Sequence, residues 1–161
     1  SNITINSWVN VIAFPAINTS GYIYAKGYDG INEQTSFRFG NGNGTMYLQI
    51  GTYKTSNNTN YITQYTVGSS IVTGTWNNIV GQYDGANWNL FLNGLLISQT
   101  LNNQPPLAST APVSIGAGYI SSAYARFLNG KIAVVQVYNR ALSAGEVLQN
   151  YNALKGRFNL T

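Results

Sequence analysis

Residues 75–100 read TWNNIVGQYDGANWNLFLNGLLISQT, and this stretch decides the fold class. Its apolar and β-branched segments are separated by Asp84-Gly85 and Asn93-Gly94, two dipeptides that are typical of tight turns. The second dipeptide lies between LFL and LLI. A two-residue type I′ turn needs positive φ at both positions, which Asn and Gly accept. We therefore predict a β-hairpin with its turn at Asn93-Gly94.

Similar short segments, separated by Gly, Asn, Asp and Pro, run along the rest of the chain. They cover residues 3–14, 22–26, 36–39, 45–53, 61–67, 113–115 and 131–138. Residues 101–112 contain three prolines and form a connector, because Pro cannot donate to the ladder of a central strand. About ten short strands at this spacing predict an all-β, two-sheet antiparallel β-sandwich.

The C-terminal segment has a helical pattern. Ser143 and Glu146 are spaced as a capping box, in which each side chain satisfies an amide of the first turn. Gly156 is expected to close the helix in a left-handed conformation. The apolar residues expected to face the sandwich recur at helical spacing, at Val147, Leu148, Tyr151 and Leu154. We predict one short amphipathic helix over residues 144–155.

The length and composition indicate a single domain over residues 1–161. A chain of 161 residues can bury a sufficient core without disulfides, and it contains no cysteine. Only 7% of its residues are charged, whereas Asn, Gly, Ser, Thr and Tyr are abundant, and these residues disfavour helix interiors or suit strands. The chain begins with Ser1 rather than Met, so we expect processing or excision from a longer chain.

The scattered charges and the short apolar runs argue against two classes of partner, nucleic acids and membranes. The net charge is +4, which could suggest nucleic acid, but the cations are scattered without a basic run or a nucleic-acid-binding motif: Lys26, Arg38, Lys54, Arg126, Lys131, Arg140, Lys155 and Arg157. No apolar run approaches the roughly 20 residues of a membrane span. We expect neither nucleic-acid binding nor membrane insertion.

The residues of two segments resemble the laminin G-like branch of the concanavalin A-like lectin and glucanase superfamily. One is the series Trp76, Val80, Tyr83-Asp84-Gly85 and Leu92-Asn93-Gly94, and the other runs from Gly130-Lys131-Ile132 through Val137-Tyr138-Asn139-Arg140-Ala141-Leu142-Ser143 to Glu146. The resemblance implies a jelly-roll sandwich that acts outside the cell, on a cell surface or on a virion surface. Family members usually carry one more strand before the Trp8 strand, so an open sheet edge is expected here, which a neighbouring chain could pair with.

The residues of a hydrolytic site are missing. Histidine and cysteine are absent, which removes the commonest general base and the thiol nucleophile. The glucanases of this superfamily use a strand with Glu-x-Asp-x-x-Glu, and no such strand occurs here. The acidic residues are Asp29, Glu33, Asp84 and Glu146. Asp84 suits a turn and Glu146 a cap, so we expect no enzyme.

A calcium site is one hypothesis for the remaining carboxylates. Asp29, Asn32 and Glu33 lie close together in the sequence and carry the oxygen ligands that calcium prefers. The resemblance supports this hypothesis, because laminin G-like and pentraxin domains often hold calcium at a rim loop. The alternative is that these residues only solubilise a loop.

Aromatic residues are 13% of the chain, and rings beside amides are a usual means of holding sugars. Trp88, flanked by Asn87 and Asn89, is the first candidate for a sugar-stacking ring, with a core position as the alternative. Trp8 and Trp76 lie within apolar strands and are assigned to the core. Weaker candidates for the ligand site are Tyr28, Tyr119 and Tyr124.

Two functions from different classes fit these observations. The first is a non-catalytic carbohydrate-binding or adhesion module whose partner is a glycan or a surface glycoprotein. The second is a structural protein of a virion, fibre or surface layer that self-associates, or pairs with a neighbouring chain, through the open sheet edge. A low charge density favours close packing of copies because their mutual repulsion is small.

Overall fold

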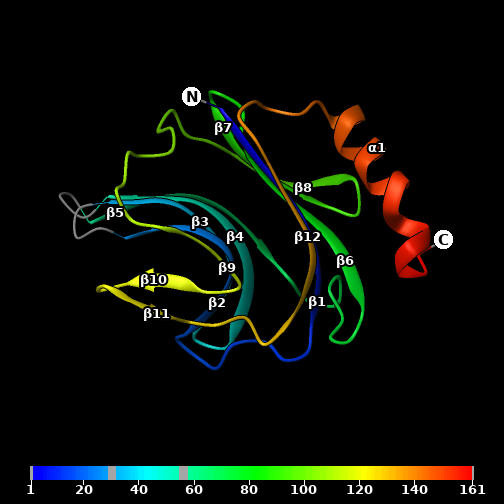
Figure 1. Ribbon diagram of the computed structural model, residues 1–161, viewed down its shortest axis with the longest axis horizontal. Helices are drawn as coiled ribbons and strands as arrows, with labels where there is room; N and C mark the ends of the chain where they lie inside the picture. Colours follow the sequence, from blue (N-terminus) through cyan, green and yellow to red (C-terminus); the bar gives the residue numbers. More distant parts are fainter. Residues whose placement is uncertain (1, 29–31, 55–57, 161) are drawn as a thin grey trace.

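The computed structural model of the protein describes residues 2–28, 32–54 and 58–160, and Figure 1 shows two curved β-sheets packed face to face. The first sheet is antiparallel, with the strand order β12 (Gly130–Tyr138), β1 (Ile3–Val11), β6 (Trp76–Tyr83), β7 (Asn87–Leu92) and β8 (Leu95–Leu101). The second is also antiparallel, in the order β5 (Thr59–Thr66), β4 (Thr45–Lys54), β3 (Asn32–Gly42), β2 (Ser20–Tyr28) and β9 (Val113–Ile115). The predicted two-sheet sandwich is confirmed.

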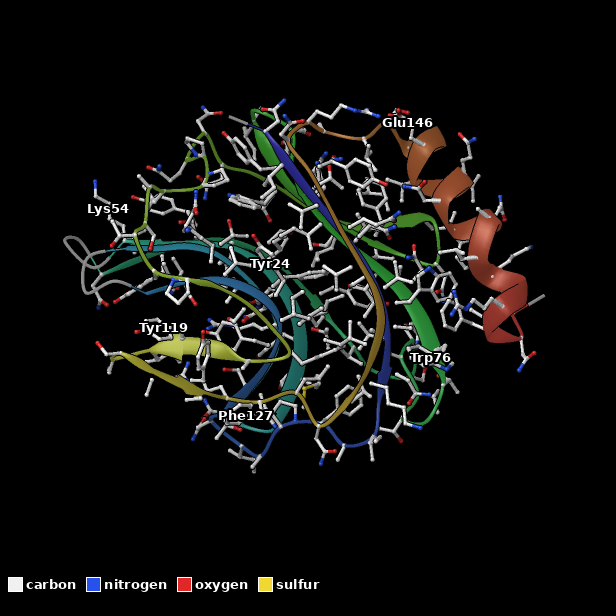
Figure 2. The ribbon with its side chains drawn as sticks, viewed as in Figure 1. Tyr24, Lys54, Trp76, Tyr119, Phe127 and Glu146 are labelled. Carbon is white, nitrogen blue, oxygen red and sulfur yellow. The ribbon has the colours of Figure 1, made fainter. Side chains whose placement is uncertain are left out.

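The core lies between the two sheets and follows the period-two alternation of strands. In β3, Phe37 and Phe39 point inward with no exposed surface, whereas Arg38 between them faces outward. Tyr24, near the centre of Figure 2, belongs to the same core. Further core residues without exposed surface come from both sheets: Ile5, Val9, Ile23, Leu48, Ile50, Ile79, Trp88 and Leu90.

The predicted hairpin turn is confirmed. Asn93 and Gly94 have φ values of 50° and 84°, and Leu92 pairs directly with Leu95 across the turn. The Asn93 side chain also accepts a hydrogen bond from the Asn78 amide at 2.9 Å, which ties the turn to β6. The first strand is shorter than predicted, because β1 ends at Val11 instead of residue 14.

A third, two-stranded unit was not predicted. β10 (Gly118–Ile120) and β11 (Ala123–Ala125) form a small hairpin, which lies within the curve of the second sheet in Figure 1. Its turn places Ser121 and Ser122 at φ values of 51° and 65°. Sequence rules assign such left-handed positions to Gly or Asn, and the strands are too short for a clear alternation, so the hairpin gives no sequence signal.

The C-terminal helix has the predicted bounds, α1 (Ala144–Lys155), and the predicted capping box. Its packing differs from the expectation, because Val147 is fully buried while Leu148 is 41% exposed. Gly156 is not the left-handed cap. It is right-handed and begins a 3-10 turn, η2 (Gly156–Phe158), after which Asn159 takes the left-handed conformation with φ 58°.

This extra turn brings Phe158 onto the outer face of the first sheet. Phe158 stacks on Trp8 with ring centroids 4.3 Å apart, and Trp76 contacts it from the side at 4.8 Å, beside the end of the helix in Figure 2. Trp8 is fully buried by this contact and by a second stacking contact with Tyr151. The core assignment of Trp8 is confirmed, although it lies beneath the helix rather than between the sheets. Trp76 is half-buried in the same cluster.

β12 is one edge strand of the first sheet, and whether this edge is left open by a missing family strand stays a prediction. β1, which carries Trp8, pairs with both β12 and β6, while β12 pairs only with β1 among the described residues.

Across the described ranges, we find no helix long and apolar enough to cross a membrane.

Candidate functional site

A row of polar side chains crosses the outer face of the second sheet. Arg38 is its centre, because its Nη1 donates to the Tyr22 hydroxyl at 2.6 Å and its Nε donates to Gln49 Oε1 at 3.2 Å. The Gln49 amide then donates to Gln64 Oε1 at 2.9 Å. The strand register places the four residues side by side, in the order Tyr22 of β2, Arg38 of β3, Gln49 of β4 and Gln64 of β5.

Tyr22 connects this row to a carboxylate. Its hydroxyl donates to Glu33 Oε1 at 2.9 Å while it accepts from Arg38, and only 1% of Tyr22 is exposed. Burial raises the pKa of Tyr22, an effect that the Arg38 charge opposes and the Glu33 charge reinforces, so the phenol stays neutral. Burial alone would lower the pKa of Arg38, but Tyr22 and Glu33 outweigh it and raise that pKa. The floor of the site is therefore a fixed network with a permanent cation.

The β10–β11 hairpin forms a wall beside this floor. It approaches β2 closely, because a Cβ at Gly118 would lie 3.0 Å from the Tyr22 ring and a Cβ at Gly27 would lie 2.7 Å from the Tyr119 Cβ. A side chain at Gly27 would require Tyr119 to move, and one at Gly118 would press on the Tyr22 ring. Directly after β11, the Arg126 carbonyl accepts a hydrogen bond from the Tyr22 amide at 3.1 Å. The β10–β11 hairpin therefore contacts Tyr22 twice, through the packing of Gly118 on its ring and through the hydrogen bond between the Tyr22 amide and the Arg126 carbonyl.

Two hollows meet at Arg38 and Arg126, and together they form what we call the arginine groove. The first hollow has a volume of about 270 Å³ and is lined by Tyr22, Glu33, Arg38, Tyr53, Asn60, Ile120 and Arg126. The second has a volume of about 300 Å³, and its lining includes Ser20, Asn41, Tyr47 and Gln49 in addition to the two arginines. The groove offers amides, hydroxyls and two guanidinium groups, with the Tyr53 ring and Ile120 as apolar surface.

The two arginines are not neutralised by salt bridges within the described part of the chain. Arg126 is exposed, and its Nη1 makes one long hydrogen bond of 3.5 Å to Ser20 Oγ. Among the described side chains, the single ion pair joins Arg140 to Glu146, away from the groove on the capping box. Among the residues that the structure describes, the groove therefore carries two guanidinium cations beside one carboxylate, that of Glu33.

The other two described carboxylates serve local structure. Asp84 accepts hydrogen bonds from the amides of Ala86 and Asn87 at 2.9 and 2.7 Å, as expected of a turn residue. Burial would raise the pKa of Asp84, but the hydrogen bonds from Asn89, Asn87 and Ala86 outweigh it and lower that pKa. The Arg140 hydrogen bond, with the Ser143 amide, lowers the pKa of Glu146 to about 2.

The prediction that Trp88 stacks on a sugar is wrong. Trp88 has no exposed surface, and its Nε1 donates to the Gln104 carbonyl at 3.2 Å within the core of the sandwich. Its neighbours are also occupied, because both Asn87 and Asn89 donate to Asp84. Trp88 and these two amides stabilise the β6–β7 turn and do not form a ligand surface.

Two of the three tyrosine candidates, Tyr119 and Tyr124, lie on the β10–β11 hairpin and are not among the described residues that line the groove. Tyr119 and Tyr124 face each other across the β10–β11 hairpin with ring centroids 5.2 Å apart, and Tyr124 is 54% exposed. Figure 2 shows Tyr119 on this hairpin. The backbone of Tyr28 pairs with Glu33, but its side chain lies outside the described residues. A contact of these rings with a ligand stays a prediction.

The expected calcium ligands are described only in part. Asp29 and the Asn32 side chain lie outside the described residues. Glu33 is 8% exposed and lines the groove, where its carboxylate accepts from Tyr22. The described residues contain no cluster of three His, Cys, Asp or Glu side chains that could hold a metal ion. Calcium at this position remains a hypothesis.

Apart from Glu33, the residues that line the groove were not predicted from the sequence. In the sequence the cations are scattered, because Arg38 and Arg126 lie far apart along the chain and meet only through the β2–β3 pairing and the β10–β11 hairpin. One signal was available: Arg38 stands between Phe37 and Phe39, so strand alternation places a cation on the outer face of a sheet. Nothing in the sequence indicated Tyr53, Asn60 or Ile120.

Two antiparallel five-stranded sheets packed face to face, followed by a short C-terminal helix, form a jelly-roll sandwich. A family model described as the concanavalin A-like lectin/glucanases superfamily matches residues 1–148, and the chain belongs to this superfamily. No curated protein sequence matches the chain.

Solved structures with the same fold come from several kinds of protein. The CBM40 domain of the Ruminococcus gnavus IT-sialidase, bound to α2,3-sialyllactose, has a TM-score of 0.73 and 17% identity over 93% of this chain and 82% of its own. A protein from Bacteroides ovatus, described as a candidate carbohydrate-binding protein, has a TM-score of 0.69 and 19% identity over 92% of this chain. The present chain spans 40% of that protein.

The receptor-binding domain of botulinum neurotoxin type G has a TM-score of 0.67 and 16% identity. The match covers 94% of this chain and 38% of the toxin domain. At these identities the similarity establishes the fold, and it leaves the ligand open because one fold serves many functions.

Proposed function

We propose that this domain is a non-catalytic carbohydrate-binding module, displayed outside the cell, that holds a glycan in the arginine groove. The observation that carries the proposal is the convergence of hydrogen-bonding side chains from β2, β3, β4 and β5, and from Arg126 directly after β11, on two adjoining hollows. Sugars present many hydroxyls and small apolar faces, and a site with several fixed polar groups and a ring matches both.

The groove is preorganised, which favours binding. Arg38 and Gln49 are already held by their neighbours in the row, so a ligand need not pay for ordering them. The volumes of about 270 and 300 Å³ lie near the lower end of the roughly 300–1,000 Å³ that is usual for small-ligand pockets. The groove therefore suits one or a few sugar units rather than a large ligand.

The structural neighbours support a carbohydrate ligand. One of them is bound to sialyllactose, and another is described as a candidate carbohydrate-binding protein. Their similarity makes a glycan the first class of ligand to test in the groove.

The described carboxylates argue against hydrolysis. Cleavage of a glycosidic bond usually takes two carboxyl groups that flank it. Glu33 is the one described carboxylate that lines the groove, whereas Asp84 belongs to the β6–β7 turn and Glu146 to the capping box. Binding without cleavage is the function that this arrangement supports.

A glycan array with the purified domain tests the proposal. Asn60 is exposed at the mouth of the groove, so Asn60→Trp should fill the first hollow and abolish array binding. Asn152→Trp adds the same ring to an exposed position of α1 and should leave binding intact. Binding that survives Asn60→Trp would place the sugar elsewhere, and a folded wild-type domain that binds no glycan would contradict the function.

A second function, assembly through a sheet edge, has its own supporting observation. β12 pairs on one side only among the described strands, and Val137 on this edge is 52% exposed. An open edge can accept a strand from another copy of the chain. Light scattering over a wide concentration range should then show self-association that Val137→Lys weakens. A monomer at all concentrations would exclude this route.

A further inference from the structure

We propose that the arginine groove selects acidic sugars, with a sugar carboxylate held between Arg38 and Arg126. This inference rests on the proposed carbohydrate-binding function and specifies its ligand class. The chemistry required is a single carboxylate on a saccharide, which both sialic acids and uronic acids carry. A guanidinium presents a planar set of donors that matches a carboxylate.

Arg38 has donors left for a ligand. Its Nη1 donates to Tyr22 and its Nε to Gln49, whereas its Nη2 donates to no group in the described part of the chain. The two existing bonds fix the plane of the guanidinium, so Nη2 is presented in one orientation. Because the side chain is half-buried beneath the groove, a carboxylate that reaches Nη2 is partly shielded from water, which strengthens the interaction.

Arg126 is held at the other side of the groove by its backbone. It has a φ of 54°, an uncommon conformation for a residue other than Gly, Asn or Asp. The Tyr22 amide fixes its carbonyl, yet within the described ranges its guanidinium makes only the 3.5 Å hydrogen bond to Ser20. Residues in such uncommon conformations are concentrated at functional sites. Arg126 thus adopts a strained backbone conformation, and its guanidinium forms no salt bridge among the described residues. Together these two observations favour a negatively charged ligand.

The charges of the groove match one anionic group. The arginines contribute two positive charges and Glu33 one negative charge, and none of the three forms a salt bridge among the described residues. Tyr22 separates Glu33 from Arg38, since its hydroxyl bonds to both. The carboxylate of Glu33 therefore does not occupy the Arg38 donors, and among the described residues of the groove one positive charge is left for a ligand carboxylate to balance.

Isothermal titration with matched sugars tests the inference. The probes are 3′-sialyllactose and a hyaluronan disaccharide, each of which carries one carboxylate, with lactose and the methyl esters of both acids as neutral controls. At least one acid should bind roughly tenfold to a hundredfold more tightly than its neutral counterpart, the loss expected for a charge-assisted hydrogen bond. Binding should weaken as salt rises, because Arg126 is exposed.

Variants of Arg126 separate the role of its charge from that of its backbone. Arg126→Asn removes the charge, but Asn accepts a positive φ, so folding should be unaffected while the preference for the acid is lost. Arg126→Lys keeps the charge without the planar donors and should retain part of the preference. An unchanged acid affinity in Arg126→Asn, with an unchanged melting temperature, would exclude Arg126 from the site.

The remaining outcomes distinguish this inference from the proposed function. Equal binding of the acid and its methyl ester would overturn the acidic-sugar inference and leave carbohydrate binding intact. Binding of a neutral glycan that Asn60→Trp blocks, without binding of either acid, would do the same. A folded domain that binds neither the acids nor any neutral glycan on the array would overturn both.

Discussion

Tyr22 and Arg38 face each other across β2 and β3 in direct register, and the Arg38 guanidinium donates to the Tyr22 hydroxyl at 2.6 Å. The same hydroxyl donates to Glu33, so one buried oxygen joins a cation to an anion. This contact holds the floor of the arginine groove in place before any ligand arrives. The stability of the domain and the shape of the site therefore depend on the same hydroxyl.

Removal of that hydroxyl should destabilise the protein. Tyr22→Phe removes one hydrogen-bond partner from Glu33 and one from Arg38, which then keeps only its hydrogen bond to Gln49 among the described residues. This loss should lower the free energy of unfolding by roughly 1–3 kcal/mol. Tyr65→Phe is the control, because its hydroxyl bonds to Ser70 in an exposed position and should matter less. Urea denaturation measures both, and an equal effect of the two variants would show that the Tyr22 contact is not part of a buried network.

The C-terminal helix should be anchored by Val147 rather than by Leu148. Val147 is fully buried against the first sheet with Val80 and Phe91, so Val147→Ala should cost about 2 kcal/mol. Leu148 is 41% exposed, so Leu148→Ala should cost about 1 kcal/mol or less. Thermal denaturation of the two variants checks the order, and a larger loss in Leu148→Ala would contradict the packing described.

Asp84 should make stability depend on acid pH. Its folded-state pKa is lowered, so its contribution is present above its unfolded pKa, near the ordinary value of 3.8, and is lost as pH falls through the folded value. Asp84→Asn keeps one side-chain oxygen as an acceptor, but its NH2 group would face the Asn89 NH2 group that now donates to Asp84. This change should lower the free energy of unfolding by roughly 1–3 kcal/mol at neutral pH. Denaturant curves from pH 6 down to pH 2, a range that extends well below the unfolded pKa, should show a smaller decline for this variant than for the wild type.

Calcium should raise the melting temperature if Glu33 acts as a ligand with Asp29 and Asn32. Carboxylate and amide oxygens would hold the ion at the edge of the groove, and binding to the folded state alone stabilises it. Scanning calorimetry with added calcium, and again with a chelator, tests the idea. Glu33→Gln should remove any calcium effect, and identical melting temperatures under both conditions would reject the site.

The sequence predicted those elements whose signals are local. The Asn93-Gly94 turn and the start of the helix at the Ser143 capping box depend on residues within a few positions of one another, and both are confirmed. Gly156 was misassigned because the end of the helix depends on a distant contact, the stacking of Phe158 on Trp8. Local chemistry could not indicate that the chain continues for another turn.

The candidate site could be predicted from the sequence only in part. Strand alternation through Leu90 and Leu92 places Trp88 on the same inward face, so its burial could have been predicted. The convergence of Arg38 and Arg126 could not, because it depends on which strands pair and on where a hairpin without sequence signal folds back. Cations that are scattered in the sequence can thus share one groove.

Chemical-shift mapping shows directly whether a glycan binds in the arginine groove. The ¹⁵N-labelled domain is titrated with 3′-sialyllactose and, separately, with lactose to high millimolar concentration. We expect saturable chemical-shift changes in the amides around the groove, at Arg38, Asn60, Ile120 and Arg126. These changes should be larger with 3′-sialyllactose than with lactose. Shifts confined to another surface, such as the β6–β7 turn, or no shifts with either sugar, would contradict glycan binding in the groove.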